Sequence, residues 1–590
     1  MVAGREGGDG MGHGITTGEY PGPVGLHAPT SGEYGPAEQI LVGPVLRHRD
    51  AQGRATLFVE TRGHHHVRVR PCDGSDTWGG GADTWMVHGH CYALIIASGL
   101  PDDRAVEYEV LVDDEVAWPP PDSGFPPSVI PPPPGDGPVR VAFGSCRELG
   151  PYDDDGLRTW GADALVALAR RLVDEPRAHW PHLILHLGDQ VYADEPSPEI
   201  AELLRELHAG DPAEIREEIQ NFREYAWLYQ TTWMHDATRW LLSTVPSAMI
   251  LDDHDLRDDW NTSKTWREEM ERRPWWNDRV VGALGSYWVY QHLGNLSPEL
   301  LAADDLFVAV VNASDRDATR LVDDHAWRSD VEPDTTRWST AQDLGCVRLV
   351  IVDSRCSRVL DPPEERAIVD GVEWQWLREQ VFADPAPRHL LIASTLPVFT
   401  PYGVHHVEGW SEAVATGAWG SIWSRIAERL RQGIDMEHWP AFRRSFDGMV
   451  GLLGEVVDRP GAPKTVLLLG GDVHFSYRAR VELTDRDHDD TRIWQLVQSP
   501  MRNILQRSMK VVFRVLRSRG ASAILGMLAR SAGVADPAVR WTFDGGLTFQ
   551  NGLMIVTADR DGASLATAIA DVDDDGRERL LAKSRRRLSG

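Results

Sequence analysis

The sequence predicts an α/β fold preceded by a small β-sandwich. Three observations support this prediction. Short β-like segments separated by turn residues fill residues 38–117, and a proline-rich connector follows at residues 118–138. Over residues 139–575, apolar strand-like runs alternate with helical patterns, which is typical of an α/β sheet covered by helices.

Composition limits the class of protein. The 590 residues exceed one ordinary domain, and 42% hydrophobic with 25% charged residues is typical of a globular protein in water. A formal net charge of −29 argues against a nucleic-acid binder, because phosphate backbones need a basic face, but it leaves room for a small phosphorylated substrate. The five cysteines include no Cys-x-x-Cys pair, which argues against a disulfide framework or a zinc knuckle.

The first region contains an expected tail and an expected sandwich. Residues 1–37 are rich in Gly, Thr, Glu and Pro, and we expect them to be disordered. They show no secretion signal, and no apolar run approaches the ~18 residues of a membrane span, so we expect a cytoplasmic protein. The sandwich, of immunoglobulin or fibronectin-III type, is predicted from four β-like runs: residues 56–60, 67–70, 92–96 and 108–112.

The second region alternates strands and helices. Leu165, Leu168 and Leu172 recur at helical spacing, and so do Trp374, Leu377 and Val381 after an expected strand at residues 348–352. The pattern of residues 201–240 indicates helices inserted between two strands. Two β-like pieces, at residues 553–558 and 564–570, precede an expected basic tail at residues 576–590.

Four apolar runs end in residues that bind metals. Residues 139–143 lead into Cys146, residues 183–187 into Asp189 and Tyr192, residues 248–251 into Asp253 and His254, and residues 466–469 into Asp472 and His474. Strand ends are where α/β sheets place their sites. A thiolate, carboxylates, a phenolate and an imidazole that converge there predict a centre with more than one metal ion.

Each side chain suggests a role. Asp189 has two oxygens and can bridge two cations, while Cys146 and Tyr192 suit a ferric ion. Asp253 and Asp472 suit calcium, magnesium or manganese, His474 can serve the other metal, and His254 can stabilise charge or donate a proton to a leaving oxygen. Taken singly, each residue has a plainer interpretation: Gly-Asp as a turn, Cys146 as core, and Asp252–Asp255 as a solvated turn or a helix cap.

These motifs resemble those of the PhoD-like metallophosphatases (the alkaline phosphatase D family), which are related in fold to purple acid phosphatases and calcineurin-like enzymes. The matching segments are Gly144–Cys146, Gly188–Asp194, Asp252–Asp255 and Gly471–His474, and Val352–Arg355 and Glu437–Trp439 resemble two further segments of the family. The resemblance covers residues 139–480 and implies a four-layer α/β/β/α sandwich.

The resemblance also implies cofactors and a ligand set. Iron (Fe³⁺) would be held by Cys146, Asp189, Tyr192 and His474. One or more divalent ions, Ca²⁺ in the family's type member, with Mn²⁺ and Mg²⁺ as alternatives, would be held by Asp189, Asp253 and Asp472.

The predicted function is metal-dependent hydrolysis of a phosphoester. Two cations would lower the pKa of a bound water, and the hydroxide would attack phosphorus in line. Arg355 or Arg147 would stabilise the phosphoryl oxygens and His254 would assist the leaving group; either arginine could instead pair with a carboxylate. The alternatives are a phosphodiesterase acting on lipid or teichoic-acid-like polymers and a non-catalytic phospho-ligand-binding protein.

Residues 504–530 form the last feature. Leu505, Met509, Val512, Phe513 and Leu516 lie at helical spacing beside a second, basic stripe of Arg507, Lys510, Arg514 and Arg517. Such a helix can make peripheral contact with an anionic membrane. The favoured interpretation is that it packs on the acidic body of the protein or covers the site as a lid. The sequence makes no prediction of oligomeric state.

Overall fold

The computed structural model describes residues 35–313, 316–433, 436–484, 486, 490–505 and 507–589. Most of the expected disordered tail, residues 1–34, lies outside the described part. The first described element is a short 3₁₀ helix, Pro36–Gln39, which leads directly into the first strand.

Two antiparallel sheets form the N-terminal region. One has the order β1 (Ile40–Arg49), β2 (Arg54–Thr61), β6 (His90–Ser98) and β5 (Trp85–Val87). The other has the order β4 (Gly80–Asp83), β3 (His66–Pro71), β7 (Val106–Val112) and β8 (Glu115–Trp118). Alternate side chains such as Leu57, Val69 and Ile95 meet in a shared apolar core, as the period of two in a half-buried strand requires.

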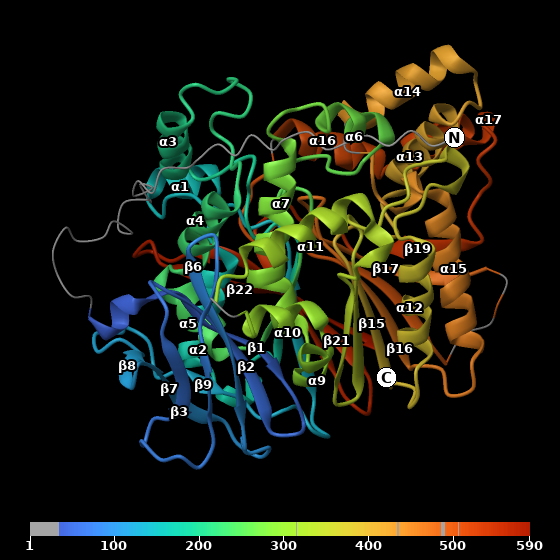
Figure 1. Ribbon diagram of the computed structural model, residues 1–590. Coiled ribbons are helices and arrows are strands. Elements are labelled where there is room, and N and C mark those ends of the chain that lie inside the picture. Colours follow the sequence, from blue (N-terminus) through green and yellow to red (C-terminus); the bar gives the residue numbers. More distant parts are fainter. Residues whose placement is uncertain are drawn as a thin grey trace. The chain divides into compact units, whose positions relative to one another are not determined.

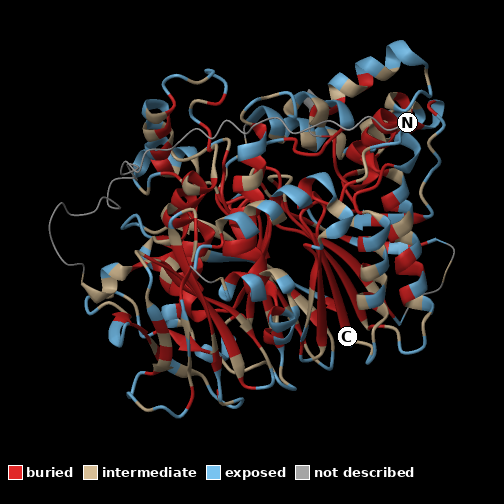
Figure 2. Cartoon of the chain, viewed as in Figure 1, coloured by how far each residue is buried: buried red, intermediate tan, exposed pale blue. Residues whose placement is uncertain are grey.

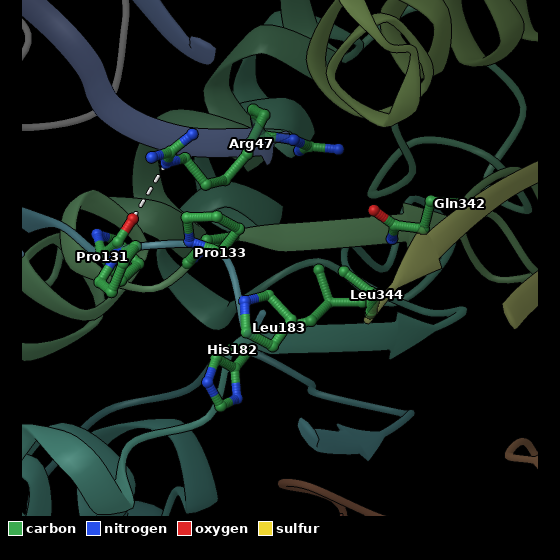
Figure 3. A pocket seen from close by; sticks show the side chains of 11 residues that line it. Arg47, Pro131, Pro133, His182, Leu183, Gln342 and Leu344 are labelled. Carbon is green, nitrogen blue, oxygen red and sulfur yellow. Dashed lines mark hydrogen bonds between the residues drawn. The ribbon is translucent and has the colours of Figure 1, made fainter. Parts of the chain in front are cut away.

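The proline-rich segment is packed against its neighbours. Its β9 (Val129–Ile130) pairs with β7, and the carbonyl of Pro131 accepts a hydrogen bond of 3.0 Å from Arg49 Nε. Pro131, Pro133 and His182 line a narrow pocket below β1, which Figure 3 shows. The segment therefore follows the protein surface rather than spanning free solvent.

A six-stranded sheet begins the second region. Its order is β12 (Ser247–Ile250), β11 (Leu183–Leu187), β10 (Val139–Gly144), β20 (Gly552–Ala558), β21 (Ala563–Val572) and β22 (Glu578–Ser589). β10, β11 and β12 are parallel, so their carboxyl ends lie at one edge. Within the expected basic tail, residues 578–589 form the edge strand β22, whose backbone pairs with β21.

A seven-stranded sheet packs on the first. Its order is β13 (Thr340–Leu344), β14 (Val347–Val352), β15 (His389–Ser394), β16 (Thr465–Gly470), β18 (Arg492–Val497), β17 (Tyr477–Leu483) and β19 (Val539–Phe543). β14, β15, β16 and β18 are parallel, and their carboxyl ends also share one edge.

Successive side chains of each strand point to opposite faces of its sheet, so each sheet packs on the other sheet with one face and on helices with the other. Phe143, Leu185, Leu391 and Leu469 point between the two sheets into one core. From the opposite faces, the first sheet packs on α2 (Ala164–Asp174) and α5 (Asp236–Thr244), and the second packs on α12 (Gly371–Phe382) and α15 (Arg443–Asp458). Figure 1 shows α12 and α15 outside the strands of the second sheet, and Figure 2 shows the strands buried. The predicted four-layer α/β/β/α sandwich is confirmed.

Helices inserted between strands connect the N-terminal sheets to the sandwich. As expected, α3 (Pro198–Leu207), α4 (Phe222–Trp233) and α5 lie between β11 and β12. After β12 come α6 (Lys264–Met270), α7 (Trp276–Tyr287), a π-helical turn (Trp288–His292), α8 (Leu293–Asn295), α9 (Pro298–Ala303), α10 (Asp305–Val311) and α11 (Thr319–Val331). Phe58 and Tyr92 of the N-terminal sheets pack against Tyr290 of this insert, so the two regions share a core.

A short helix, α1 (Asp154–Thr159), follows β10, and four further helices gather near the carboxyl ends of the second sheet. They are α13 (Tyr402–Ala415), α14 (Ser421–Gly433), α16 (Arg507–Leu516) and α17 (Arg519–Ser531). The single helix expected over 504–530 is two helices, because Ser518 caps a new helix by accepting from the Ala521 N–H. Within the described residues, every helix is too short or too polar to cross a bilayer.

Candidate metal centre

The candidate centre lies where strand ends of both sheets meet. Cys146, Asp189 and Asp253 follow β10, β11 and β12 of the first sheet, while Asp472 and His474 follow β16 of the second. Glycine allows this close approach: a Cβ on Gly471 would lie 2.5 Å from Ser145, and a Cβ on Gly188 would lie 2.4 Å from Asp252 Cβ. No larger residue fits there without moving the turns apart.

The backbone is strained at the residues that face the centre. Cys146, Asp189, Asp472 and His474 have φ values of 57°, 53°, 65° and 52°. L-residues rarely adopt this left-handed region, and such strain clusters at functional sites. Hydrogen bonds hold the turns in place: Cys146 N–H donates to the Gly188 carbonyl at 3.4 Å, and Asp472 N–H donates to Ser145 Oγ at 2.9 Å.

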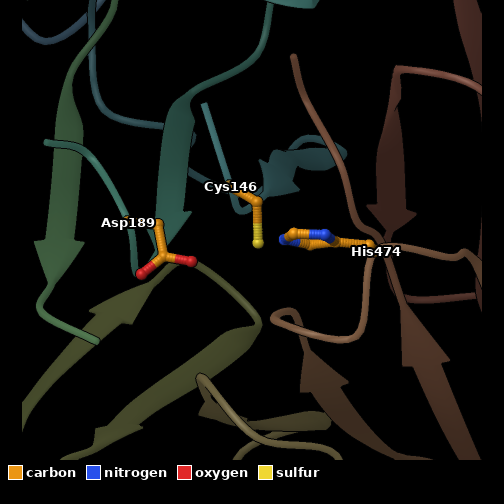
Figure 4. Close-up of side chains that lie close together, drawn as sticks. All are labelled: Cys146, Asp189 and His474. Atoms are coloured by element: carbon orange, nitrogen blue, oxygen red, sulfur yellow. The ribbon is translucent and has the colours of Figure 1, made fainter. Parts of the chain in front are cut away.

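One group of donors contains Cys146, Asp189 and His474. An Sγ, a carboxylate oxygen and a ring nitrogen from these residues all lie within 4.8 Å of one another. Figure 4 shows the three side chains directed toward a common point. The thiol is fully buried and lies 3.1 Å from Ser145 Oγ and 3.2 Å from Ser499 Oγ. Thiol, imidazole and carboxylate are the donor set expected for a transition-metal ion.

A second group contains Asp189, Asp252, Asp253 and Asp472. Their carboxylate oxygens meet the same 4.8 Å limit, and all four are carboxylates suited to a hard cation. Asp189 belongs to both groups, which is the position of a bridging ligand. Asp252 was not among the predicted ligands, although it lies in the Asp252–Asp255 motif; its carboxylate points inward together with that of Asp253.

Burial makes the cluster unfavourable without compensating charge. Burial, reinforced by the Asp252 carboxylate, raises the pKa of Asp189 well above its usual range. Burial likewise raises the pKa of Asp253, and burial with the Asp189 carboxylate raises the pKa of the Cys146 thiol. Burial lowers the pKa of His474 to about 4, which leaves its imidazole neutral at pH 7 and able to bind a metal.

Buried oxygens without hydrogen-bond partners fit the same interpretation. Both carboxylate oxygens of Asp189 and Oδ2 of Asp252 are buried and lack a partner among the described residues. Such groups cost free energy unless something satisfies them. A cation between the two groups would satisfy them, so the residues present fit a centre with more than one metal ion.

Tyr192 and His254 flank the first group. Tyr192 is buried, and burial together with Asp189 and Cys146 raises the pKa of its hydroxyl well above the usual value. Its ring stacks on His254 with centroids 4.7 Å apart. Although burial opposes it, the carboxylate of Asp194, 3.0 Å from Nδ1, raises the pKa of His254 well above 6.5 and keeps the ring protonated.

Arg355 lies inside the carboxylate cluster and is fully buried. Its guanidinium bonds to Asp252 and Glu437, and Nη2 lies 3.0 Å from Asp253 Oδ1. Nε and Nη1 are therefore bound to protein carboxylates, whereas Nη2 makes an ion pair with Asp253 but no hydrogen bond among the described residues. A contact between Arg355 and phosphoryl oxygens stays a prediction. Burial would raise the pKa of Glu437, but Arg355 and Arg358 hold that pKa far below its usual range. Glu437 therefore stays ionised beside the two arginines.

Two carboxylates that position other groups were missed by sequence reasoning. Asp255 Oδ2 accepts from the backbone N–H groups of Asp189 and Asp252 at 2.9 and 2.8 Å. Glu408 bonds to His438, whose Nε2 lies 3.4 Å from Asp472 Oδ2. Asp255 stands in a recognised motif, whereas Glu408 lies in the middle of α13 and carries no sequence signal.

Arg147 is a correction. It was predicted to contact substrate, but its side chain turns away from the cluster and is buried. Nε donates to Asp163 at 3.0 Å and Nη1 to the Thr232 carbonyl at 3.0 Å. It fixes the turn after β10 to α2 and α4.

Comparison with known proteins agrees with this geometry. Residues 165–300 match the model of the PhoD-like phosphatase family, and residues 37–130 match a family described as a domain of unknown function, DUF7800. The PhoD-like match contains Asp189, Tyr192, Asp253 and His254. No curated protein sequence matches the chain.

Two solved structures are similar to the chain. A structure of PhoD is 10% identical, covers 95% of this chain and 94% of its own, and gives a TM-score of 0.56. A purple acid phosphatase, PPD1, from yellow lupin (Lupinus luteus) seeds is 11% identical, covers 92% of this chain and 74% of its own, and gives a TM-score of 0.49. At these identities, the likeness to PhoD concerns the fold.

Proposed function

We propose that this chain, a PhoD-like metallophosphatase and hence a phosphoester hydrolase, cleaves its substrate at the two donor groups joined by Asp189. One observation carries the proposal: the buried carboxylate of Asp189 belongs to both donor groups. The first group also contains a thiol and an imidazole, and the second contains further carboxylates. A carboxylate in this position can join two cations at the separation that two-metal hydrolysis uses.

The donor chemistry assigns the ions. Cys146, Tyr192, Asp189 and His474 would hold Fe³⁺, because the anionic thiolate and phenolate are strong donors that stabilise a trivalent transition-metal ion. Asp189, Asp253 and Asp472, with Asp252 beside them, would hold Ca²⁺, Mn²⁺ or Mg²⁺. Bound there, the ions would activate water and neutralise charge on the phosphoryl oxygens.

The protein's own groups would supply the rest. His254 is held protonated by Asp194, so it can give a proton to the leaving alkoxide oxygen as the P–O bond breaks. Arg355 keeps Asp252 and Asp253 in place by ion pairing, which makes it a positioning residue. The Asp255 carboxylate fixes the backbone of Asp189.

Asp189→Asn provides the test. It should reduce hydrolysis of a chromogenic phosphomonoester and a chromogenic phosphodiester by at least about 1,000-fold, because one bridging oxygen is lost. The protein should bind fewer metal ions by elemental analysis and remain folded by circular dichroism. Asp76→Asn, whose side chain is 83% exposed, is the matched control and should behave as the unmodified chain.

Visible spectroscopy tests the iron assignment separately. The iron-loaded protein should show a charge-transfer band from thiolate or phenolate to Fe³⁺. Cys146→Ser and Tyr192→Phe should each shift or weaken it. An unchanged band in both variants, or full turnover by Asp189→Asn, would contradict the proposed centre.

A further inference from the structure

The helices α14, α16 and α17 form a surface with many exposed apolar side chains; we refer to it as the helical surface. All three contact α13, and α16 also contacts α17; Figure 1 shows the three helices in the upper part of the view. Its exposed apolar residues are Ile422, Trp423, Ile426, Met509, Val511, Val512, Val515, Ile524 and Met527. Their relative exposure runs from 38% for Met509 to 67% for Ile422. Exposed apolar groups gathered this way mark a binding surface.

The same surface is basic in an acidic protein. Residues 491–535 contain no Asp or Glu, although the whole chain has a formal net charge of −29. The cations within residues 504–530 are Arg507, Lys510, Arg514, Arg517, Arg519 and Arg530. Lys510 is close enough to Arg507 and Arg514 for their charges to lower its pKa, although burial contributes more.

One side of α16 packs against the protein, and the other faces solvent. Phe513 packs on Phe475 with ring centroids 4.6 Å apart, and Arg514 and Arg517 lie over Phe549 and Phe543. None of the described residues of α16 is buried. Val511 and Val515, one helical turn apart, are 57% and 54% exposed, and Arg507 is exposed nearby. These residues therefore take no part in the packing of α16 on the protein and are free to meet another surface.

We propose that the helical surface docks on an anionic lipid surface. Apolar side chains beside Lys and Arg are the features that hold an amphipathic helix in a membrane interface. The positive charge complements anionic lipid head groups, and each cation near such a membrane raises the partition coefficient by about fivefold. The contact would be peripheral, since no helix of the described part can span a bilayer.

A second copy of the chain is a poorer occupant. A symmetric dimer through this surface would bring Arg507 and Lys510 of each copy toward the same cations of the other, and like charges at an interface repel. The lipid surface supplies both the apolar layer and the opposite charge.

The docked position would place the candidate metal centre near the membrane. Phe475, which packs on α16, directly follows His474 in the chain, and Asn503 Nδ2 lies 3.5 Å from the Tyr192 hydroxyl. α16 is therefore attached to the wall of the centre. Docking itself does not depend on the proposed hydrolysis.

Vesicle sedimentation of the purified full chain tests the proposal. The protein should sediment with vesicles of phosphatidylcholine mixed with phosphatidylglycerol, and much less with phosphatidylcholine alone. Added salt should weaken binding, because it screens the charges. Sedimentation that ignores both lipid charge and salt would overturn the proposal, and so would no sedimentation at all.

Two double variants locate the contact. Val511→Ser with Val515→Ser, and Arg507→Gln with Lys510→Gln, should each lower the partition coefficient at least about tenfold. The controls are Val372→Ser, at a site 60% exposed on α12, and Arg320→Gln, whose side chain is 93% exposed on α11. They should bind as the unmodified chain does; equal loss in the controls would overturn the assignment.

Two further measurements distinguish lipid docking from misfolding and from dimerisation. Melting curves and vesicle-free hydrolysis should be unchanged in the serine variant, which shows that lost binding is not lost folding. Analytical ultracentrifugation should show no self-association that depends on Val511 and Val515. A dimer abolished by the serine variant, without vesicle binding, would identify a second copy as the occupant and overturn the proposal.

Discussion

Arg355 shows how a single residue can make a carboxylate cluster tolerable. Four carboxylates form ion pairs with one buried guanidinium, the most distant being Asp472 at 3.9 Å, and Arg358 adds a second cation at 3.1 Å from Glu437. Buried charges persist only when they are paired and hydrogen-bonded. The cluster therefore keeps its geometry through fixed protein cations, with room left for mobile ones beside Asp189.

Replacing Arg355 should destabilise the fold as well as impair turnover. Arg355→Met leaves Glu437 and Asp252 without their main partner, which should cost about 3–5 kcal/mol in the free energy of unfolding, measured in guanidinium chloride. Arg355→Lys should recover part of this loss. Arg320→Met is the control. Unchanged stability with lost turnover would instead identify Arg355 as a contact to substrate.

At the residue scale, the sequence predicted which turns carry the candidate ligands, but it did not predict the direction of every side chain in those turns. Cys146, Asp189 and His474 follow apolar runs, and a strand end leaves little choice about where they lie. Arg147 follows Cys146 directly, yet it points to Asp163 and Thr232, which are distant in the sequence. Side-chain direction beside a left-handed backbone position depends on such long-range partners, which one sequence does not reveal.

At the element scale, α12 holds the carboxyl group of Glu373 in a buried position, where its charged form is unfavourable. Burial, with Asp353 next in effect, raises the pKa of Glu373 to about 8 from 4.5; the Ser339 N–H, Asp370 and Arg337 also act on it. The folded protein therefore binds a proton that the unfolded chain releases above pH 4.5. Stability should fall as the pH rises from about 4.5 to 8, at no more than about 1.4 kcal/mol per pH unit.

Glu373→Gln should remove this pH dependence. Urea unfolding at pH 5 and at pH 8 should show that the variant gains stability relative to the unmodified chain as the pH rises. Glu379→Gln, at an exposed position of the same helix, is the control and should show no such gain. A constant difference between Glu373→Gln and the unmodified chain at both pH values would contradict the prediction.

Element boundaries were predictable where apolar periodicity was strong. The helical spacing of Leu165, Leu168 and Leu172 identified α2. The apolar stripe from Leu505 to Leu516 suggested one helix over residues 504–530, yet Ser518 starts a new helix there, because its hydroxyl competes for backbone N–H groups. The strand β22 escaped prediction because its charged side chains face outward at a sheet edge, where pairing with β21 decides the structure.

At the scale of the whole molecule, the N-terminal sheets are part of one folding unit with the sandwich. Arg47 of β1 donates to the Asn295 side chain at 3.0 Å and to the Gln291 carbonyl. Phe58 and Tyr92 pack on Tyr290. The proline-rich segment suggested a clean boundary in the sequence, but composition does not show which surfaces meet across it.

A chain without the N-terminal sheets should therefore not fold into a stable protein. A chain that starts at residue 131 exposes Tyr290 and its apolar neighbours, and should aggregate or melt without cooperativity in size-exclusion and circular-dichroism measurements. In the full chain, Phe58→Ala should cost about 3–5 kcal/mol, whereas Val116→Ala, at a site 44% exposed, should cost less than about 0.5 kcal/mol. A monodisperse truncated protein with an unchanged melting temperature would contradict this prediction.

The candidate ligands come from both sheets: Cys146, Asp189 and Asp253 from one, Asp472 and His474 from the other. A complete coordination sphere cannot exist until the sheets have docked, so the ions would enter an assembled protein and not guide its assembly. The fraction of chains carrying a full set of ions would then report how much of a preparation has folded correctly.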